Sequence, residues 1–260
     1  MDTLRLCIIQ MEIDEQRNSR NMENAYTMAK QCISDDPDIM LLPELWCCGY
    51  SISKNKLLGE RAERFMTWFA EEFSVAVAGS IPVLEQGNFY NRMLFVDEQG
   101  KIRGYYDKIH LFKPFGEDSV FSPGNKVSIV EYKGVKIGFE ICHDLKFPEL
   151  SRRLALMGVS LILVSAAWSL KRLEQWHLFT RVRAAENQVF LAASNRVGES
   201  STLEEVFAGH SIVVDPYGSI LSMLGFKQGY LIIEIDLREV EKARKQMFLL
   251  AERRKDIYEQ

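Results

Sequence analysis

Apolar residues along the chain form short runs of strand length, which alternate with longer segments where they recur at helical spacing. The short runs predict strands at residues 4–9, 39–42, 75–81, 89–96, 101–106, 135–141, 161–165, 189–194, 206–214, 219–224 and 230–235. The longer segments predict helices around residues 22–33, 62–73, 149–157 and 173–188, and a charged helix from Leu237. Each helix buries one face, so the pattern predicts an α/β fold in which helices cover sheets.

Two features of the pattern narrow this fold class. The runs at 89–96 and 101–106 flank the turn Glu98-Gln99-Gly100 and predict an antiparallel hairpin. Hairpins among crossover connections argue against a simple doubly wound sheet and against a regular barrel. The chain contains no Gly/Ser linker, low-complexity tract or repeat, so we expect one domain over residues 1–260.

Composition and charge exclude several classes of protein. The chain has 260 residues, of which 47% are hydrophobic, enough for a full core. Its 32 basic and 36 acidic side chains nearly balance, which disfavours nucleic acid as a partner. No apolar run approaches the length of about 20 residues that a membrane span needs. The five cysteines form an odd set without a secretory signal, so we expect a cytoplasmic protein without membrane partners.

Cys142 is a candidate nucleophile. It follows the strand predicted at 135–141 and precedes a helix that begins near Phe147 or Pro148. Backbone N–H groups at such a helix start lower the pKa of a thiol and stabilise a nearby anion. The alternative is a small core residue. His143 is adjacent, but neighbouring side chains of an extended chain point in opposite directions, so a partner for the thiol must come from elsewhere.

Three charged side chains near predicted strands are further candidates. Glu44 follows a strand and Pro43, where partial burial would suit a general base, although a surface or capping role is the alternative. Lys108 follows another strand and could stabilise an oxyanion, or it could protect a sheet edge. Glu117 is a loop carboxylate that could position a lysine or relay a proton. His110 is either a base or a structural hydrogen-bonding residue.

Several motifs are absent from the sequence. It has no glycine-rich phosphate loop, no dinucleotide-binding fingerprint and no G-x-S-x-G elbow. The four histidines show no metal-ligand spacing, and Cys47 and Cys48 lack the second pair that a zinc site needs. We therefore expect neither a cofactor nor a metal.

Three segments of the chain together resemble a known family. LLPEL around Glu44, YDKIHLF around Lys108 and GFEICHDLKFPEL around Cys142 resemble the signature blocks of the nitrilase superfamily of carbon–nitrogen hydrolases. The resemblance implies a four-layer α-β-β-α sandwich that forms homodimers. It also implies a catalytic triad of Glu44, Lys108 and Cys142, with Glu117 as a second glutamate.

Other segments resemble one branch of this superfamily. AAWSLKRLEQWHLFTRVRAAENQVF, SNRVG and AGHSIVVDPYG are most similar to the omega-amidase branch. The resemblance implies hydrolysis of small linear amides, the terminal amides of short dicarboxylic acids such as 2-oxoglutaramate, through a cysteine thioester with release of ammonia. The same triad would also serve an N-carbamoyl amidase, an aliphatic amidase or a nitrilase. A non-catalytic scaffold is the alternative from another class.

Substrate-binding residues follow from these expectations. The backbone N–H of His143, which stands where many relatives carry Tyr or Phe, is expected to help Lys108 hold an oxyanion. Trp168, and with it Trp176, lines the pocket or packs in the core. A monoamide of a dicarboxylic acid also needs a cation for its free carboxylate, and the candidates are Arg172, Arg196 and Lys113.

Overall fold

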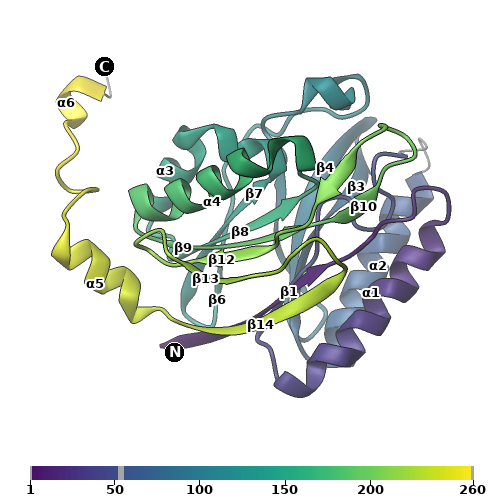
Figure 1. The fold of residues 1–260 in the computed structure, drawn as a ribbon, viewed down its shortest axis with the longest axis horizontal. Coiled ribbons are helices and arrows are strands. Elements are labelled where there is room, and N and C mark those ends of the chain that lie inside the picture. Colours follow the sequence, from purple (N-terminus) through teal and green to yellow (C-terminus); the bar gives the residue numbers. More distant parts are fainter. Residues whose placement is uncertain (1, 52–55, 259–260) are drawn as a thin grey trace.

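The computed structural model describes residues 2–51 and 56–258, and two six-stranded sheets form the centre of the molecule (Figure 1). In spatial order, the first sheet contains β14 (Gly229–Asp236), β1 (Thr3–Gln10), β2 (Ile39–Leu41), β3 (Ala76–Glu85), β4 (Asn88–Val96) and β5 (Ile102–Asp107). The second contains β13 (Ile220–Met223), β12 (Ile212–Val214), β9 (Phe190–Asn195), β8 (Leu161–Ala166), β7 (Val135–Ile141) and β6 (Ile129–Tyr132).

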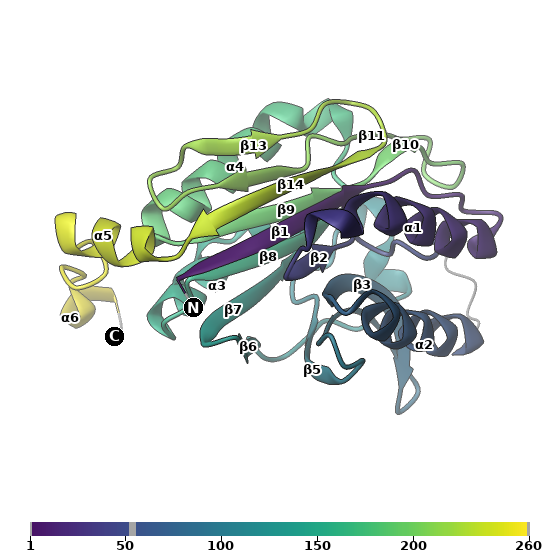
Figure 2. The same ribbon diagram turned by 90° about the horizontal axis from the view of Figure 1, so that it is seen from below.

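Helices cover the outer face of each sheet (Figure 2). α1 (Asn18–Cys32) and α2 (Lys56–Phe73) lie on the first sheet, and α3 (Pro148–Leu156) and α4 (Leu173–Asn187) lie on the second. The predicted four-layer α-β-β-α sandwich is confirmed. The hairpin predicted from the turn at Gly100 is formed by β4 and β5, which pair antiparallel.

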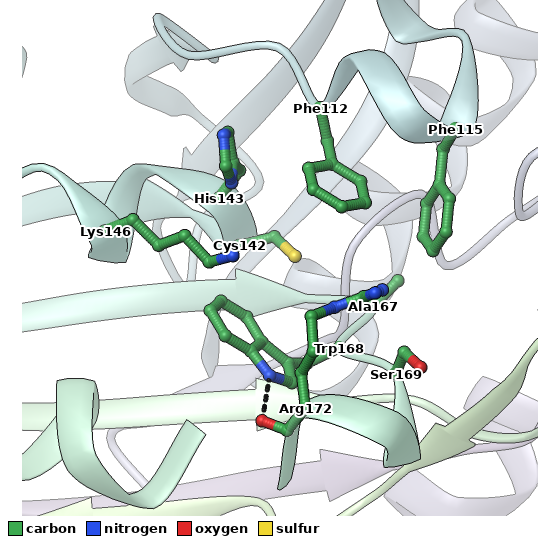
Figure 3. A pocket seen from close by; sticks show the side chains of 9 residues that line it. All are labelled: Phe112, Phe115, Cys142, His143, Lys146, Ala167, Trp168, Ser169 and Arg172. Carbon is green, nitrogen blue, oxygen red and sulfur yellow. Dashed lines mark hydrogen bonds between the residues drawn. The ribbon is translucent and has the colours of Figure 1, made fainter. Parts of the chain in front are cut away.

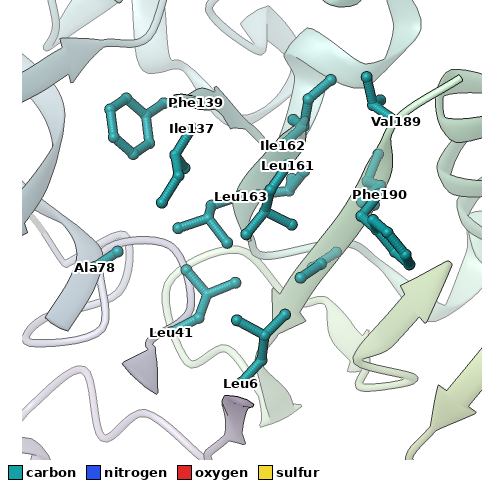
Figure 4. Packing of buried hydrophobic residues seen from close by; sticks show 14 of the residues in the cluster. Leu6, Leu41, Ala78, Ile137, Phe139, Leu161, Ile162, Leu163, Val189 and Phe190 are labelled. Atoms are coloured by element: carbon teal, nitrogen blue, oxygen red, sulfur yellow. The ribbon is translucent and has the colours of Figure 1, made fainter. Parts of the chain in front are cut away.

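The larger hydrophobic core lies between the two sheets. Leu6 of β1 and Leu41 of β2 face Ile137 of β7 and Leu163 of β8 across this interface (Figure 4). Side chains alternate along a strand, so Met40, between Ile39 and Leu41, instead joins a second cluster beneath α1 and α2. Each leucine or isoleucine fully buried in this way contributes roughly 1.5–3 kcal/mol.

Parallel strands in each sheet determine where the site can form. β2 pairs parallel with β1 and β3, and β8 pairs parallel with β7 and β9. All six residues of β8 are buried, because helices and the opposite sheet cover both of its faces. The carboxyl ends of such strands lie at one edge of a sheet, where the loops that follow them can converge on one site.

The prediction of one continuous strand over residues 206–214 is wrong, because the structure has two strands there. The segment forms β11 (Val206–Ala208), which pairs with β10 (Val197–Glu199), and then β12. The backbone turns between them at Gly209 and His210, with φ values of 62° and 52°. A Cβ at Gly209 would lie 2.5 Å from a Val197 methyl, so the close approach of the chain requires glycine.

The C-terminal segment extends away from the sandwich (Figure 1). The helix predicted from Leu237 is α5 (Arg238–Gln246), and a short helix, α6 (Lys255–Tyr258), follows it. Met247, Phe248 and Ile257 in this segment are exposed. Within the described part of the chain, no helix has the length and hydropathy to cross a membrane.

Candidate active site

The candidate residues Glu44, Lys108 and Cys142 lie near strand ends of both sheets, at one place in the fold. Glu44 comes shortly after β2, Lys108 directly after β5, and Cys142 directly after β7. The backbone N–H of Glu44 donates to the carbonyl of Ala166 at the end of β8, 3.2 Å away, and so joins the two sheets at this point. The site therefore lies between the sheets, at their shared end.

Lys108 binds two carboxylates. Its Nζ lies 2.7 Å from Glu44 Oε1 and 2.7 Å from Glu117 Oε1, and all three side chains are fully buried. Burial alone would lower the pKa of Lys108, but the charges of Glu117 and Glu44 outweigh burial and raise this pKa. The lysine is therefore a buried cation, well suited to stabilise a negative charge.

The carboxylate of Glu44 has a fixed orientation. Its Oε1 also accepts a hydrogen bond of 2.8 Å from the side-chain amide of Asn91, and its Oε2 accepts one of 3.0 Å from the backbone N–H of Ala167. Asn91 lies in β4, and the sequence analysis missed it. Two adjacent polar residues inside an otherwise apolar run, Asn91 and Arg92, were the available signal.

The carboxylate of Glu117 also has a fixed orientation. Its Oε1 accepts a 2.9 Å hydrogen bond from the hydroxyl of Tyr50, and its Oε2 accepts one of 2.6 Å from the N–H of Phe112. Burial raises the pKa of Glu117, and the charge of Lys108 opposes that effect. The structure thus brings together Glu44, Lys108 and Glu117, which the sequence placed far apart.

Cys142 begins a short 3-10 helix, Cys142–Lys146, in a strained conformation. Its φ is 46°, in the left-handed region that residues other than glycine rarely adopt. Such a conformation costs on the order of 1–3 kcal/mol and persists only where its surroundings impose it. The side chain of Asp144 supplies one constraint, because its Oδ2 accepts a 2.9 Å hydrogen bond from the N–H of Ile141.

Asp144 also gives His110 a structural role. Its Oδ1 accepts a 3.0 Å hydrogen bond from the backbone N–H of His110 and lies 2.8 Å from His110 Nδ1. The His110 ring stacks on Phe147, with centroids 3.7 Å apart. Of the two roles considered for His110, these contacts match the structural one.

The electrostatics around Cys142 differ from the sequence expectation. Burial, and then the charge of Glu44, raise the pKa of the thiol well above its usual value, while Lys108 and the N–H of Ala167 oppose them. The expected lowering of this pKa is wrong, because the loss of water on burial outweighs the groups that favour the thiolate. Cys142 is therefore a protonated thiol at neutral pH, and it needs a base to become a nucleophile.

A small pocket opens beside the thiol (Figure 3). It is lined by Phe112, Phe115, Cys142, His143, Lys146, Ala167, Trp168, Ser169 and Arg172. Three of the expected substrate-binding residues, His143, Trp168 and Arg172, are among them. The pocket volume is about 10 Å³, close to the space of one water molecule.

Three other candidates, Trp176, Arg196 and Lys113, do not line this pocket. Trp176 is fully buried behind Trp168, with ring centroids 5.6 Å apart, and belongs to the core. Arg196 is also fully buried, and its guanidinium is 2.9 Å from Glu15. Lys113 is exposed and lies outside the pocket. A sequence shows the charge of a side chain but not its burial or its partner.

Lys146 is the cation that the sequence analysis missed. It follows Cys142 by four residues, about one helical turn, and this spacing was the available signal. Its Nζ lies 5.4 Å from the ring centroid of Trp168 and 5.7 Å from that of Phe112. Burial, and then the neighbouring charge of Arg172, lower the pKa of Lys146.

His143 presents an uncharged ring to the pocket. Its ring contacts Phe112 and Phe147, with centroids 4.8 and 5.3 Å away. Burial, together with the charges of Lys108 and Lys146, lowers the pKa of His143 to about 4. The ring is therefore neutral at pH 7, and Lys146 and Arg172 are the cations that line the pocket.

Comparison with known proteins identifies the family of this fold and site. The family described as carbon-nitrogen hydrolase matches residues 5–245, nearly the whole chain. The chain belongs to this family. A 2-oxoglutaramate amidase of Bacillus subtilis is 35% identical over 256 residues, covering 96% of this chain and 97% of that protein. An omega-amidase of Mus musculus is 30% identical over 271 residues, covering 99% and 98%.

The solved structures agree with this membership in the carbon–nitrogen hydrolase family. Nit3 of Saccharomyces cerevisiae, described as a member of branch 10 of the nitrilase superfamily, superimposes with a TM-score of 0.87. It is 26% identical, and the match covers 97% of both chains. The predicted enzyme class, a carbon–nitrogen hydrolase of amidase type, is confirmed.

Proposed function

We propose that the protein is an omega-amidase, which hydrolyses the terminal amide of short dicarboxylic monoamides such as 2-oxoglutaramate. One observation carries the proposal: a pocket with two cations, Lys146 and Arg172, opens beside a buried thiol next to the Glu44–Lys108–Glu117 cluster. The relatives named 2-oxoglutaramate amidase and omega-amidase support the same substrate class.

The first step is attack of Cys142 on the amide carbon. Glu44 takes the thiol proton as the C–S bond forms, and the carbonyl π electrons move to oxygen. Lys108 Nζ and the backbone N–H of His143 stabilise this oxyanion. Removal of one such donor typically raises the barrier by about 3–4 kcal/mol.

The second step breaks the C–N bond and then the thioester. Glu44 gives its proton to the departing nitrogen, so ammonia leaves and an acyl thioester remains on Cys142. Glu44 then takes a proton from water as the water oxygen attacks the thioester. It returns that proton to the sulfur as the C–S bond breaks, so the Cys142 thiol is regenerated and a dicarboxylic acid is released. Glu117 touches no reacting atom in this scheme and keeps Lys108 in place.

Lys146 and Arg172 are assigned to the free carboxylate of the substrate. Among the residues that the structure describes, no carboxylate forms an ion pair with either of them, so both charges are available to a ligand. Because the pocket volume is only about 10 Å³, a bound monoamide must displace the flexible ends of these two side chains. Two cations in the wall of the pocket favour an anionic substrate over a neutral one.

A substrate panel tests the proposal. Purified protein should release ammonia from 2-oxoglutaramate, and more slowly from neutral aliphatic amides that lack the carboxylate. Carbon dioxide from an N-carbamoyl substrate would instead indicate a carbamoyl amidase, and a nitrile consumed faster than its amide would indicate a nitrilase. No ammonia from any short omega-amide would overturn the substrate assignment. A protein inactive on the whole panel, with slow uniform alkylation of its five thiols, would be a scaffold.

The proposal includes a homodimer in the cytoplasm. Leu178 and Val182 are exposed one turn apart on α4, and Met247 and Phe248 are exposed beyond α5. Such apolar surface is typical of subunit contacts.

All five cysteines are free, and the thiols of Cys7 and Cys32 lie 3.1 Å apart, an arrangement that a reducing compartment preserves.

A further inference from the structure

Tyr50 lies behind the proposed catalytic cluster. Its hydroxyl donates to Glu117 Oε1 at 2.9 Å, the same oxygen that accepts from Lys108 Nζ at 2.7 Å. Tyr50 is 8% exposed and is not among the side chains that line the pocket beside Cys142. Its ring packs edge-on against Phe115, which does line that pocket, with centroids 5.3 Å apart.

The backbone of Tyr50 is fixed by a second buried carboxylate. The N–H of Tyr50 donates to Glu15 Oε1 at 3.3 Å. The preceding residue, Gly49, has a φ of 58°, and a Cβ there would lie 2.7 Å from the Glu15 side chain. The chain can therefore approach Glu15 this closely only with glycine at position 49. Tyr50 is anchored at both its backbone and its hydroxyl.

Glu15 is itself held in place by Arg196. Arg196 Nη1 lies 2.9 Å from Glu15 Oε1, and both side chains are buried. The hydroxyl of Ser200 also donates to Glu15, at 2.7 Å from Oε2, and the N–H of Thr202 donates to the same oxygen at 3.1 Å. A buried ion pair whose carboxylate accepts several further hydrogen bonds makes a rigid support. Arg196 thus supports the segment that carries Tyr50.

We propose that Tyr50 is a positioning residue that acts through Glu117: its hydroxyl keeps the Glu117 carboxylate ionised and directed at Lys108. The inference rests on the proposed function, in which Lys108 stabilises the oxyanion. Glu117 accepts three hydrogen bonds, from Lys108, Tyr50 and the N–H of Phe112. Hydrogen bonds to a carboxylate favour its charged form, so removal of one donor makes protonation easier.

Protonation of Glu117 would change the position of Lys108. A neutral Glu117 attracts the ammonium less, so Lys108 Nζ is no longer held midway between two carboxylates, each 2.7 Å away. Lys108 is then less precisely placed to stabilise the oxyanion that forms in each turnover. Loss of the Tyr50 hydroxyl should therefore reduce turnover rather than substrate binding.

The variant Tyr50→Phe tests this inference because it removes only the hydroxyl. We expect kcat to fall about tenfold, the cost of one charged hydrogen bond, while KM changes less than about twofold, since Tyr50 does not line the pocket. The acid limb of the kcat–pH profile should move up by about one pH unit. Tyr132→Phe is the matched control: Tyr132 is 7% exposed, and its hydroxyl donates to Glu98 Oε2 at 2.8 Å, away from the site.

Two further variants separate positioning from general packing. If Tyr50 acts through Glu117, then Tyr50→Phe should reduce kcat much less in a Glu117→Gln background than in the wild type. Replacement of Tyr50 by 4-aminophenylalanine restores a donor in the same shape and should return the pH profile toward wild type. Equal losses in both backgrounds, or no rescue by the amino group, would refute the proposal.

Alkylation of Cys142 makes the test independent of turnover. The charge of Glu117 raises the pKa of the Cys142 thiol, so easier protonation of Glu117 should make this thiol more reactive. We expect iodoacetamide to modify Cys142 faster in Tyr50→Phe than in wild type or Tyr132→Phe at the same pH, as followed by peptide mass spectrometry. Identical alkylation profiles and identical kcat–pH profiles would overturn the role of Tyr50. If instead no amide is hydrolysed by the wild type, the proposed function fails, and alkylation still decides the inference.

Discussion

The hydroxyl of Tyr106, in β5 of the first sheet, donates a 2.8 Å hydrogen bond to Asp144 Oδ2, in the short 3-10 helix that follows β7 of the second sheet. Asp144 follows Cys142 by two residues, and Lys108 follows Tyr106 by two. This one bond therefore joins the segment that carries the proposed nucleophile, Cys142, to the segment that carries Lys108, the proposed oxyanion cation. Both side chains are fully buried, so their relative position is fixed without competition from water.

Replacement of Asp144 should damage both stability and activity. Asp144→Ala leaves the N–H groups of Ile141 and His110 and the Tyr106 hydroxyl without their acceptor. We expect the free energy of unfolding to fall by about 3–5 kcal/mol, since each buried unsatisfied group costs about 1–3 kcal/mol. Urea unfolding measures this loss. An exposed counterpart, Asp118→Ala, should change it little, and a fully stable Asp144→Ala variant would contradict the assigned role.

Cys142→Ala should abolish turnover and leave the fold intact. The proposed mechanism has no route that omits the thioester, so we expect a loss of about 10⁴-fold or more in kcat. Cys48→Ala is the control, because Cys48 is buried outside the pocket. Mass spectrometry of wild-type protein trapped with substrate should show an acyl adduct on Cys142 alone. Ammonia release by Cys142→Ala at the original rate would make the mechanism wrong.

Lys146 and Arg172 should determine the preference for anionic amides. Lys146→Met and Arg172→Met each remove one cation, so we expect kcat/KM for 2-oxoglutaramate to fall about 30-fold or more, since loss of one partner of a desolvated charge pair costs about 2 kcal/mol or more. The value for a neutral amide of similar length should change by less than about threefold. Lys113→Met, on an exposed residue outside the pocket, is the control. Equal losses for both substrates would argue against a carboxylate site.

Glu140 should make stability depend on pH. This carboxyl is fully buried, its Oε1 accepts from the Ser151 hydroxyl, and its Oε2 is buried without a partner in the described structure. Burial raises the pKa of Glu140 to about 8. The folded state therefore retains a proton that the unfolded chain releases above its ordinary pKa of 4.5. Stability falls as the pH rises from about 4.5 to 8, and the loss stays constant above that range.

The variant Glu140→Gln tests whether stability falls as the pH rises because of Glu140. It removes the ionisation, so the free energy of unfolding of the variant minus that of the wild type should increase between about pH 5 and 8, by on the order of a few kcal/mol. Urea unfolding at four pH values measures the difference. A difference that stays constant over this range would mean that Glu140 does not titrate as its burial suggests.

The sequence predicted most of the strands and the proposed catalytic triad, but not what holds the triad in place. The run at 161–165 predicts a strand correctly, because all of β8 is buried and its apolar residues are therefore continuous. Glu44, Lys108 and Cys142 each stand near a strand end, a position that local pattern shows. The sequence did not indicate a role for Tyr50, because that role depends on a hydrogen bond to Glu117, 67 residues away. Arg196 stayed a candidate for the substrate carboxylate for the same reason, since its partner Glu15 is 181 residues away.

The exposed face of α4 should form the proposed dimer contact. Leu178 is 57% exposed and Val182 is 36% exposed, and they lie four residues apart on one side of the helix. A glutamate at position 178 would place a charge in an apolar interface, so Leu178→Glu should be monomeric while the wild type is dimeric. Light scattering after size-exclusion chromatography measures both masses. Val206→Glu, at an exposed valine of β11, should remain dimeric because it lies on a different element. A wild-type protein that elutes as a monomer at micromolar concentration would contradict the dimer, whatever the variants do.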